Sequence, residues 1–587
     1  MGKASRNVAK GRPGVTSERR GLRRILCHFA LLALLLPVAG AAQEPKQPEP
    51  APPPGGPVGR LFYGNYTTPQ THSLDLKGES GLAALIVDGK VRLTPEECVR
   101  LALEGNVDIN VERYGPYLSM WGIQKGRGVL NSAVNFNARL DRSVVPASSA
   151  LQGGASVLNL QNLYDFLWHK PFEFGLDVDV SYNTRRTRGN SFFLSLNPAF
   201  QPGLGFTLTQ HLLKDFGRIS RGRFVRIARN NYEISQETFV ARTTDIITTV
   251  LNTFWDLVYA DEDIRIKEES RKLAELTLEQ NKIQAEVGTM APLDVVQAEA
   301  EVATRNEQLV ISRFTRKMAE DQLKKLLSSR IDEASIAAPI QPVIGSFALP
   351  PRAGSTEEAI RQAIEIRPEV KQAQLEQENR KIQVDYTRNQ LRPMFDFIAG
   401  YNQTGLGGNR IIRDYSQGFI NAPIVEVQHG GFWDSMDSLF SQKYLGYAVG
   451  FNLRMPIGND DARATNAQAQ IEYRQGDERL RSLKQRIALE VRQAYNRMEM
   501  DRARIEAADA TVRYSERKLQ GEQEKYALGA TTTRFVLEAQ RDLLDAQTRL
   551  LRAKLDLIKS KIAIDKVVGD TFAANNIELK DALPPFK

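Results

Sequence analysis

The feature that most constrains the fold is a stretch from Arg223 to Val287 that contains no glycine and no proline. As a single helix this stretch would be about 100 Å long, at roughly 1.5 Å per residue. An ordinary globular core uses helices of about 11 residues on average, so it has no place for such a rod. We therefore expect long helices that pack side by side.

The rod ends in a turn that the chain makes twice, at 287–299 and again at 528–540. Gly288 and Gly529 occupy the same place in the two copies. Each glycine ends a long helical stretch, and each copy then opens another helix, as glycine just past a helix end commonly does. We expect each turn to reverse the direction of the chain.

Each copy also begins in the same way. Residues 94–97, Thr-Pro-Glu-Glu, supply an N-cap, a proline at the first helical position and a capping-box glutamate. Residues 355–358, Ser-Thr-Glu-Glu, open the second copy, and five of the nine positions that follow from Glu96 are identical at an offset of 261. The sequence thus predicts two repeats, 91–345 and 346–570, and a C-terminal tail, 571–587.

Both repeats contain the same order of helices. One helix precedes strand-like segments, a long helix follows them, and a return helix follows the turn. The expected ranges are 107–131, 217–287 and 292–327 in the first repeat, and 368–391, 460–528 and 533–568 in the second. The two shorter helices together are about as long as the unbroken one, so we expect them to stack end to end beside it.

The apolar residues of the second long helix recur at sevens, which predicts left-handed supercoiling. This column contains Val491, Met498, Ile505, Val512, Leu519 and Tyr526. The last helix carries two adjacent apolar columns, headed by Val536 and Leu537. A face of that width suits a helix with neighbours on both sides, as in a ring of helices.

Alternating apolar and polar residues predict strands between the helices. The alternation covers 136–140, 176–182 and 204–208 in the first repeat, and 395–401 and 447–455 in the second. Gly-rich loops with aromatic residues are expected at 148–170 and 405–443. From alternation alone an ordinary half-buried sheet is the favoured interpretation, with a membrane β-barrel as the alternative.

The N-terminal segment has the pattern of a secretory signal. Eight Lys and Arg stand against one Glu in residues 1–42, an apolar run covers 25–38, and small residues fill 39–42. A Pro-rich N-terminal extension is expected at 43–90. Because seven of the eight net positive charges lie in the leader, the rest of the chain is nearly neutral, and no bulk charge favours nucleic acid.

The sequence contains no pattern typical of a reactive site. The five histidines are scattered, and Cys98 is the only cysteine outside the leader, so neither a structural zinc site nor an internal disulfide is expected. A phosphate-binding loop and a dinucleotide-binding glycine motif are both missing from the sequence. We expect no catalytic residue, metal or cofactor, and hence no enzyme.

Taken together, the chain resembles the outer-membrane efflux proteins, of the TolC kind, over nearly its whole length after the leader. The duplicated order of elements, the turns at Gly288 and Gly529 and the phrase Ala-Gln-Arg-Asp-Leu-Leu-Asp-Ala-Gln at 539–547 carry the resemblance. It implies a mainly α fold with β, in which an α-helical barrel is continued by a membrane β-barrel. It also implies a homotrimer in which each chain gives four strands, although the first repeat shows three strand-like stretches where the family uses two.

The resemblance implies a location and partners. The protein is expected in the outer membrane of a Gram-negative bacterium, surrounded by outer-membrane lipid and extending into the periplasm. As a channel it would be a passive exit duct of a tripartite efflux or type I secretion system, without nucleic acid. A periplasmic adaptor, also called a membrane fusion protein, would dock at Gly288 and Gly529 and couple the duct to an inner-membrane RND or ABC transporter.

Matched position by position, the resemblance also places a periplasmic gate. Asp294 and Tyr526 fall on residues that link the paired turns in the closed state, and Glu538 falls on an acid that faces the pore. Two positions depart from the family, because Thr531 stands where a link-forming arginine is expected and Phe535 where a second pore acid is expected.

Two other classes of protein remain open. A periplasmic coiled-coil adaptor or scaffold without a pore would explain the heptads, but not the alternating strands in both repeats. A secreted enzyme would require a constellation of reactive residues that the sequence does not contain.

Overall fold

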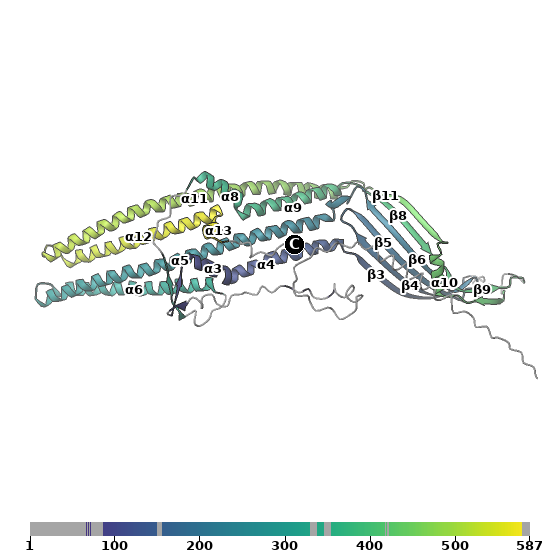
Figure 1. Ribbon diagram of the computed structural model, residues 1–587, viewed down its shortest axis with the longest axis horizontal. Helices are drawn as coiled ribbons and strands as arrows, with labels where there is room; N and C mark the ends of the chain where they lie inside the picture. Colours follow the sequence, from purple (N-terminus) through teal and green to yellow (C-terminus); the bar gives the residue numbers. More distant parts are fainter. Residues whose placement is uncertain are drawn as a thin grey trace, which may run out of the picture.

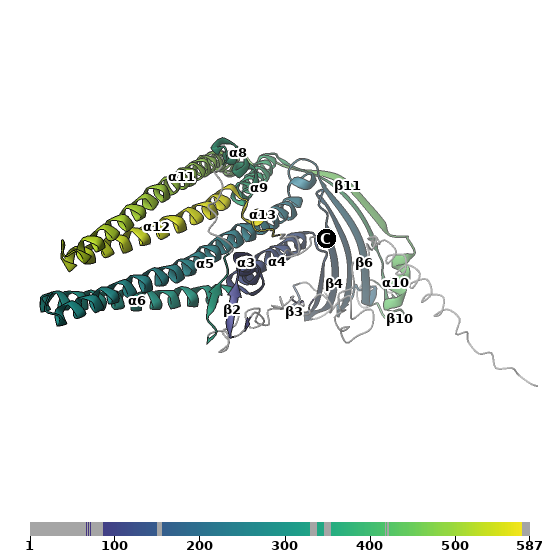
Figure 2. The ribbon, with the colours of Figure 1, turned by 60° about the vertical axis from the view of Figure 1, so that its left-hand side comes forward.

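The structure is a computed structural model. It describes Ile86 to Ile577 except for residues 88, 149–154, 329–336, 345–353, 417 and 419–421, together with three isolated positions before Ile86. The expected signal peptide, 1–42, lies outside the described residues, as do nearly all of 43–90 and the end of the tail from 578. The described chain forms a long helical layer with a curved sheet at one end (Figures 1 and 2).

Two unbroken helices run the length of the helical layer. These are α5 (Gly222–Glu286, 65 residues) and α11 (Asp460–Ala527, 68 residues). The start of the first is later than predicted, because Gly217–Ile219 forms a separate 3₁₀ turn, η5. Both helices reach from the sheet to the far end of the molecule, here named the tip, where the two predicted turns lie (Figure 1).

The shorter helices stack in pairs beside the long ones, as predicted. Helices α4 (Val107–Arg127) and α6 (Pro292–Leu327) both pack on α5. Helices α9 (Pro368–Gln390) and α12 (Thr533–Val568) both pack between α5 and α11. Their lengths of 21 and 36 residues, and of 23 and 36, approach those of the long helices. The chain therefore builds a layer four helices wide.

The predicted heptad column of α11 is buried. Its members Val491 and Met498 are 0% and 2% exposed, and they pack with Ala553, Leu557 and Ile564 of α12. Farther along the column, Val512 and Leu519 pack with Val536, Ala539 and Leu543. Both apolar columns of α12 contain buried residues, which is the expected result of neighbours on two sides.

Short elements surround the level where the stacked helices meet (Figure 1). They are β1 (Ile86–Val87), β2 (Lys90–Leu93), β7 (Ile340–Pro342), α3 (Pro95–Gly105), α8 (Thr356–Ile366) and α13 (Thr571–Ala574). The capping box predicted at Thr94 is present, with Glu97 N donating to Thr94 Oγ1 and Thr94 N to Glu97 Oε2. Ser355 begins α8 without a side-chain cap hydrogen bond, so the two repeat starts are alike in place but not in capping.

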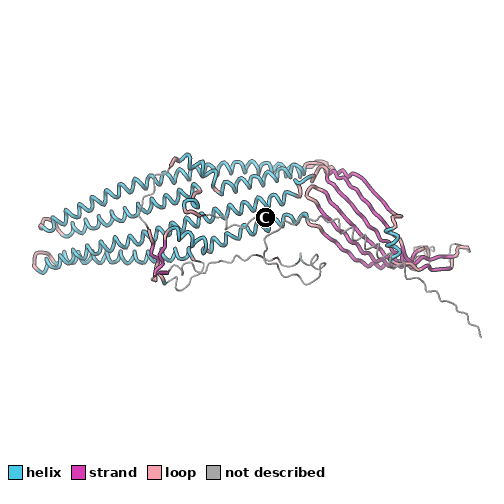
Figure 3. The backbone as a smooth tube through the Cα atoms, viewed as in Figure 1, coloured by secondary structure: helices cyan, strands magenta, loops and turns pink. Residues whose placement is uncertain are grey.

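The sheet lies at the end opposite the tip (Figure 3). Six antiparallel strands lie side by side in the order β3 (Ala133–Pro146), β4 (Ser156–Pro171), β5 (Leu176–Gly189), β6 (Leu196–His211), β8 (Met394–Thr404) and β11 (Leu445–Arg454). A short 3₁₀ turn, η3 (Gly128–Leu130), joins α4 to β3. The expectation of four strands is wrong, because the first repeat alone supplies four.

Both predicted loops contain regular structure. Most of 148–170 is β4, the partner of both β3 and β5. Within 405–443 lie β9 (Gly407–Arg413), β10 (Ile424–Gln428) and α10 (Phe432–Phe440). Strand β9 continues beside β6 beyond the end of β8, and α10 packs on β6, β8 and β9. The prediction of loops at both places is therefore wrong.

The sheet has two chemically different faces, which the strand register defines. Residues directly opposite one another share a face. One face, here named the apolar face, includes the row Val134, Trp168, Val180, Phe206, Tyr401 and Tyr447. The adjacent row on the other, polar face is Asn135, Leu167, Ser181, Gly205, Asn402 and Gly446. Apolar side chains on β11 are strongly exposed, Tyr447 by 80% and Val449 by 67%.

Among the described residues, no helix combines the length and the apolar character that crossing a bilayer requires.

Candidate functional site

The two turns at the tip have the same backbone geometry. Gly288 and Gly529 have φ values of 82° and 71°, in the left-handed region that glycine adopts without strain. Thr289 N donates to Gln284 O at 3.0 Å, and Ala530 N donates to Lys525 O at 2.8 Å. Each glycine N–H donates to the carbonyl three residues before it. Both turns are thus Schellman motifs, in which glycine ends the helix and the chain reverses.

Tyr526 links the second repeat to the first. Its hydroxyl donates to Asn281 Oδ1 at 2.6 Å and lies 3.1 Å from Gln284 Oε1. Asn281 is fully buried, and its Nδ2 donates to the backbone oxygen of Asp294 at 3.4 Å. The hydroxyl of Tyr526 therefore connects the last turn of α11 to the last two turns of α5.

The other predicted gate residues do not make such a link. Asp294 lies in the first turn of α6, and its carboxylate makes no hydrogen bond or ion pair with any described residue. Thr531 Oγ1 donates to Glu522 Oε2 at 3.2 Å, within its own repeat. Glu538 is exposed on α12, close enough to Lys518 and Arg541 to act on both electrostatically.

A stronger link between the repeats lies about three helical turns from the tip, on the side toward the sheet. It was not predicted from the sequence. Glu301 of α6 is 1% exposed, and Arg305 Nη2 lies 2.6 Å from its Oε1. Arg541 of α12 donates from Nε to Glu301 Oε2 at 2.9 Å and forms a further ion pair with it. Burial raises the pKa of the Glu301 carboxyl, but hydrogen bonds and charges from Arg541 and Arg305 outweigh burial and lower it overall.

The sequence did contain a partial signal for this cluster. Glu301 and Arg305 are spaced i,i+4, which places them on one helix face. Arg541 belongs to the phrase at 539–547 that helped to carry the family resemblance. Nothing in the sequence alone pairs positions 240 residues apart. A second polar link, from Gln540 Nε2 to Thr277 Oγ1 at 3.0 Å, accompanies the cluster.

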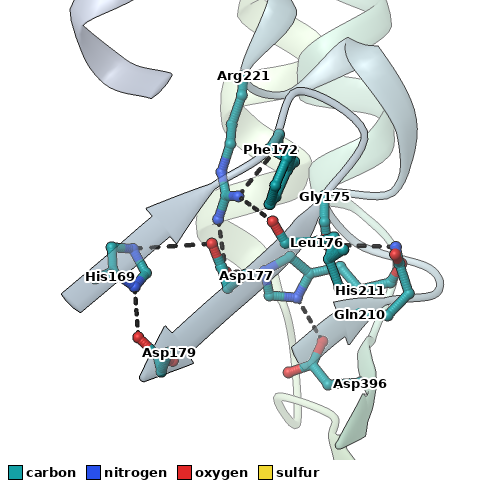
Figure 4. A network of polar contacts seen from close by, with 10 residues as sticks. All are labelled: His169, Phe172, Gly175, Leu176, Asp177, Asp179, Gln210, His211, Arg221 and Asp396. Atoms are coloured by element: carbon teal, nitrogen blue, oxygen red, sulfur yellow. Dashed lines mark hydrogen bonds and ion pairs between the residues drawn. The ribbon is translucent and has the colours of Figure 1, made fainter. Parts of the chain in front are cut away.

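A second polar network joins the sheet to the helices on the polar face (Figure 4). Asp177 lies at its centre, on β5. Arg221, directly before α5, donates from Nη2 to Asp177 Oδ2 at 2.8 Å and also reaches the carbonyl oxygens of Phe172 and Leu176. The start of the long helix is therefore tied to the turn between β4 and β5.

Two histidines flank Asp177 in this network. His211 Nε2 lies 3.4 Å from Asp177 Oδ2, and His211 Nδ1 lies 2.7 Å from Asp396 Oδ1. His169 Nδ1 lies 2.7 Å from Asp179 Oδ1 and its Nε2 3.9 Å from Asp177 Oδ1. The network spans the four strands β4, β5, β6 and β8, and through Arg221 it joins the sheet to the start of α5.

These arrangements hold helices to one another and to the sheet. In the described part of the chain, no three His, Cys, Asp or Glu side chains are placed to hold a metal ion. The links at the tip are hydrogen bonds and ion pairs between separate helices. Such links can break and reform while all covalent bonds stay intact.

Comparison with known proteins relates this geometry to membrane channels. A sequence model of the family described as outer membrane efflux protein matches residues 173–329 and 359–570. A search of curated proteins gives no significant match.

Similar folds occur among solved structures. The outer-membrane channel OprN aligns with a TM-score of 0.57 and 15% identity, over 86% of this chain and 98% of that chain. The CmeC outer membrane channel of Campylobacter jejuni gives 0.56 and 15%, over 88% and 98%. The outer membrane protein VceC of Vibrio cholerae gives 0.56 and 15%, over 81% and 96%. At this identity the likeness establishes a shared fold.

Proposed function

Because the chain belongs to the outer membrane efflux protein family, we propose that it forms the passive exit duct of a tripartite exporter. Three copies would surround a water-filled lumen, with the sheets in the outer membrane and the tips in the periplasm. A periplasmic adaptor would open the tip, and an inner-membrane RND or ABC transporter would supply the energy. The leader at 1–42 would direct secretion, and the extension at 43–90 would precede the repeats at 91–345 and 346–570.

The observation that carries this proposal is the pair of open edges on the molecule. Among the described strands, β3 pairs only with β4, and β11 only with β8, so each leaves one row of backbone N–H and C=O groups without a partner. Exposed edges of this kind are templates for pairing with a strand of another chain. Since six antiparallel strands alternate in direction, β3 of one copy can follow β11 of the next in antiparallel order.

The helical layer supports the same assembly. Exposed apolar residues follow one stripe of α4 at alternating steps of four and three. They are Val107, Val111, Tyr114, Leu118 and Trp121. On α6 of the same edge, Phe314 and Met318 are each 64% exposed. A neighbouring copy packed on this edge would bury both sets.

The test is membrane fractionation followed by mass determination of the detergent-purified protein. We expect a trimer in the outer-membrane fraction. A water-soluble monomer or dimer in the periplasm would contradict the proposal and favour the coiled-coil adaptor or scaffold. Channels of defined conductance in planar bilayers would then distinguish a duct from a membrane-bound scaffold.

We also propose that Asp294, Tyr526, Thr531 and Glu538 belong to the gate at the tip, with Tyr526 as its main link. Tyr526→Phe removes the hydroxyl that donates to Asn281 and should raise the resting conductance. Thr511→Val, which removes a side-chain hydrogen bond to Ala507 O within α11 and away from the gate residues, is the matched control and should leave it unchanged. Equal conductance in the wild type and in Tyr526→Phe would contradict the role of Tyr526.

Docking of the adaptor is proposed at Gly288 and Gly529. Nothing lies within 4 Å of a Cβ built at either glycine, so a larger side chain would project from the turn toward a partner. We expect Gly288→Trp and Gly529→Trp to reduce cross-linking to the adaptor. Normal cross-linking in both variants would contradict this role.

A further inference from the structure

The apolar face of the sheet carries arginines but no carboxylates. Following the register of β3, β4, β5, β6, β8 and β11, no position on this face is Asp or Glu. Three arginines lie on it, Arg142 on β3 and Arg186 and Arg188 on β5. The opposite face has both signs of charge, as in the Arg139–Asp141 pair. The apolar face also carries a few uncharged polar residues, such as Asn162 and Thr184, and it is purely cationic where it is charged.

The three arginines form one cluster at the end of the sheet away from the helices. Arg142 and Arg188 lie directly opposite Leu160 on its two sides. Arg186 is one step back on the same strand face as Arg188. With strands about 4.8 Å apart and about 6.6 Å between alternate residues, the three Cα atoms lie within about 12 Å of one another.

Among the described residues, none of these guanidinium groups has an ion-pair partner. Arg142 and Arg188 are exposed, and Arg186 is half-buried with its Cζ 5.8 Å from the ring centre of Phe200. No ion pair or hydrogen bond joins any of the three side chains to a residue that the structure describes. Unpaired arginines in a cluster leave their fork of donors available for an anion.

The position of the arginines along the strands indicates which kind of anion they bind. Lys170, opposite Val178, is the nearest cation toward the helices, and eight residues separate Val178 from Arg186. That distance is about 26 Å along the strand, close to the apolar band of about 25 Å that outer-membrane proteins present to lipid. Tyr164, opposite Thr184, lies at the end of this band next to the arginines, where aromatic residues meet headgroups.

We propose that Arg142, Arg186 and Arg188 bind the phosphate groups of a phosphorylated lipid in the outer leaflet. The acyl chains of that lipid would lie on the apolar face, while the guanidinium groups would take its phosphates as bidentate partners. The inference rests on the proposed function, because it requires the sheet to lie in the outer membrane with its apolar face toward lipid.

The experiment measures lipid retained by the detergent-purified protein, by mass spectrometry after incubation with bis-phosphorylated lipid A or with its dephosphorylated form. We expect the wild type to retain the phosphorylated form preferentially. The triple variant Arg142→Gln, Arg186→Gln, Arg188→Gln should retain at least tenfold less. Arg185→Gln is the matched control, since Arg185 is on the same strand but faces the polar side, and it should match the wild type.

Several outcomes would overturn the inference. These are equal retention by the triple variant, an equal loss in Arg185→Gln, equal binding of both lipid forms, or complete displacement by inorganic phosphate at the lipid concentration. If the triple variant fails to assemble, the exposed pair Arg142→Gln, Arg188→Gln carries the same comparison.

Fractionation of the wild type separates this inference from the proposed function. A protein outside the outer membrane would contradict the function itself. A protein within the outer membrane that shows no phosphate preference would contradict the lipid site alone.

Discussion

At the scale of single residues, the links that matter at the tip join side chains far apart in the sequence. Tyr526 could be selected from the resemblance, and its hydroxyl meets Asn281 and Gln284. The pairing of Glu301 with Arg541 could not be predicted, because no sequence pattern relates two positions so far apart. Helix periodicity predicts which face a residue occupies, whereas pairing across repeats depends on the axial register of separate helices.

Glu301 should make stability near the tip depend on pH. Its folded-state pKa lies below the ordinary value of 4.5, so its stabilising contribution is present above that value and is lost as pH falls through the folded-state pKa. Glu301→Gln leaves Arg305 buried without a counter-charge and should destabilise the protein by about 3 kcal/mol at pH 7. Thermal denaturation should show this difference shrinking below about pH 4.5.

Glu299→Gln is the control for that measurement. Glu299 pairs with Lys282 at 3.2 Å, but both side chains are about half exposed, so its removal should cost well under about 1 kcal/mol. A difference between the wild type and Glu301→Gln that stays constant from pH 7 to acid would contradict the role of the Glu301 charge.

Cys98 should be unreactive in the folded protein. It is fully buried in the core shared by α3, α5 and α6, and burial, aided by the charge of Glu97, raises the pKa of its thiol to about 12. At pH 8 almost no thiolate is present, and thiolate is the reactive form. With Cys27 replaced by alanine, iodoacetamide should label the protein only after denaturation, and rapid labelling of the native protein at pH 8 would contradict this placement.

At the scale of elements, the helices could be predicted closely and the strands only in part. Pro292 begins α6 and Gly569 follows the end of α12, and both helices have the predicted bounds. Strand β4 was missed because Leu163 and Leu167 occupy polar-face positions and interrupt the alternation of Tyr164, Phe166 and Trp168. Strand periodicity is a weak signal where both faces carry apolar residues.

The glycines of the turns and of the helices should respond in opposite ways to alanine. Gly288→Ala and Gly529→Ala force a Cβ into the left-handed region and should each cost about 1 kcal/mol, although no atom obstructs the methyl group. Gly521→Ala, inside α11 and equally unobstructed, should stabilise by about 0.5–1 kcal/mol. Chemical denaturation of the three variants would measure both signs, and destabilisation by Gly521→Ala would contradict the helical assignment there.

At the scale of the whole molecule, the single chain leaves two strand edges and one apolar helix face without a partner among the described residues. Its sheet ends in two open edges, and its helical layer exposes the apolar stripe of α4. The sequence predicted the layer of stacked helices from their lengths alone. It did not predict the width of the sheet, because strand number depends on segments whose pattern is ambiguous.

The stripe on α4 should be required for assembly. Leu118 is 73% exposed in the single chain, and Leu118→Glu would place a charge in the contact between copies. We expect the purified variant to run as a monomer or to aggregate, whereas Gln124→Glu, an exposed position off the stripe, should remain a trimer. Light scattering in detergent measures the mass, and an intact trimer for Leu118→Glu would show that this face is not the contact.

The end-to-end stacking of the shorter helices gives the layer a mechanical property. Every second rod is interrupted at one level, while α5 and α11 pass through it unbroken. That level can act as a fulcrum, with α6 and α12 as lever arms of about 54 Å each. A tilt of about 10° there would move the ends of α6 and α12 at the tip by about 9 Å. A small adjustment beside α3 and α8 would therefore be amplified into a displacement large enough to separate Arg541 of α12 from Glu301 of α6.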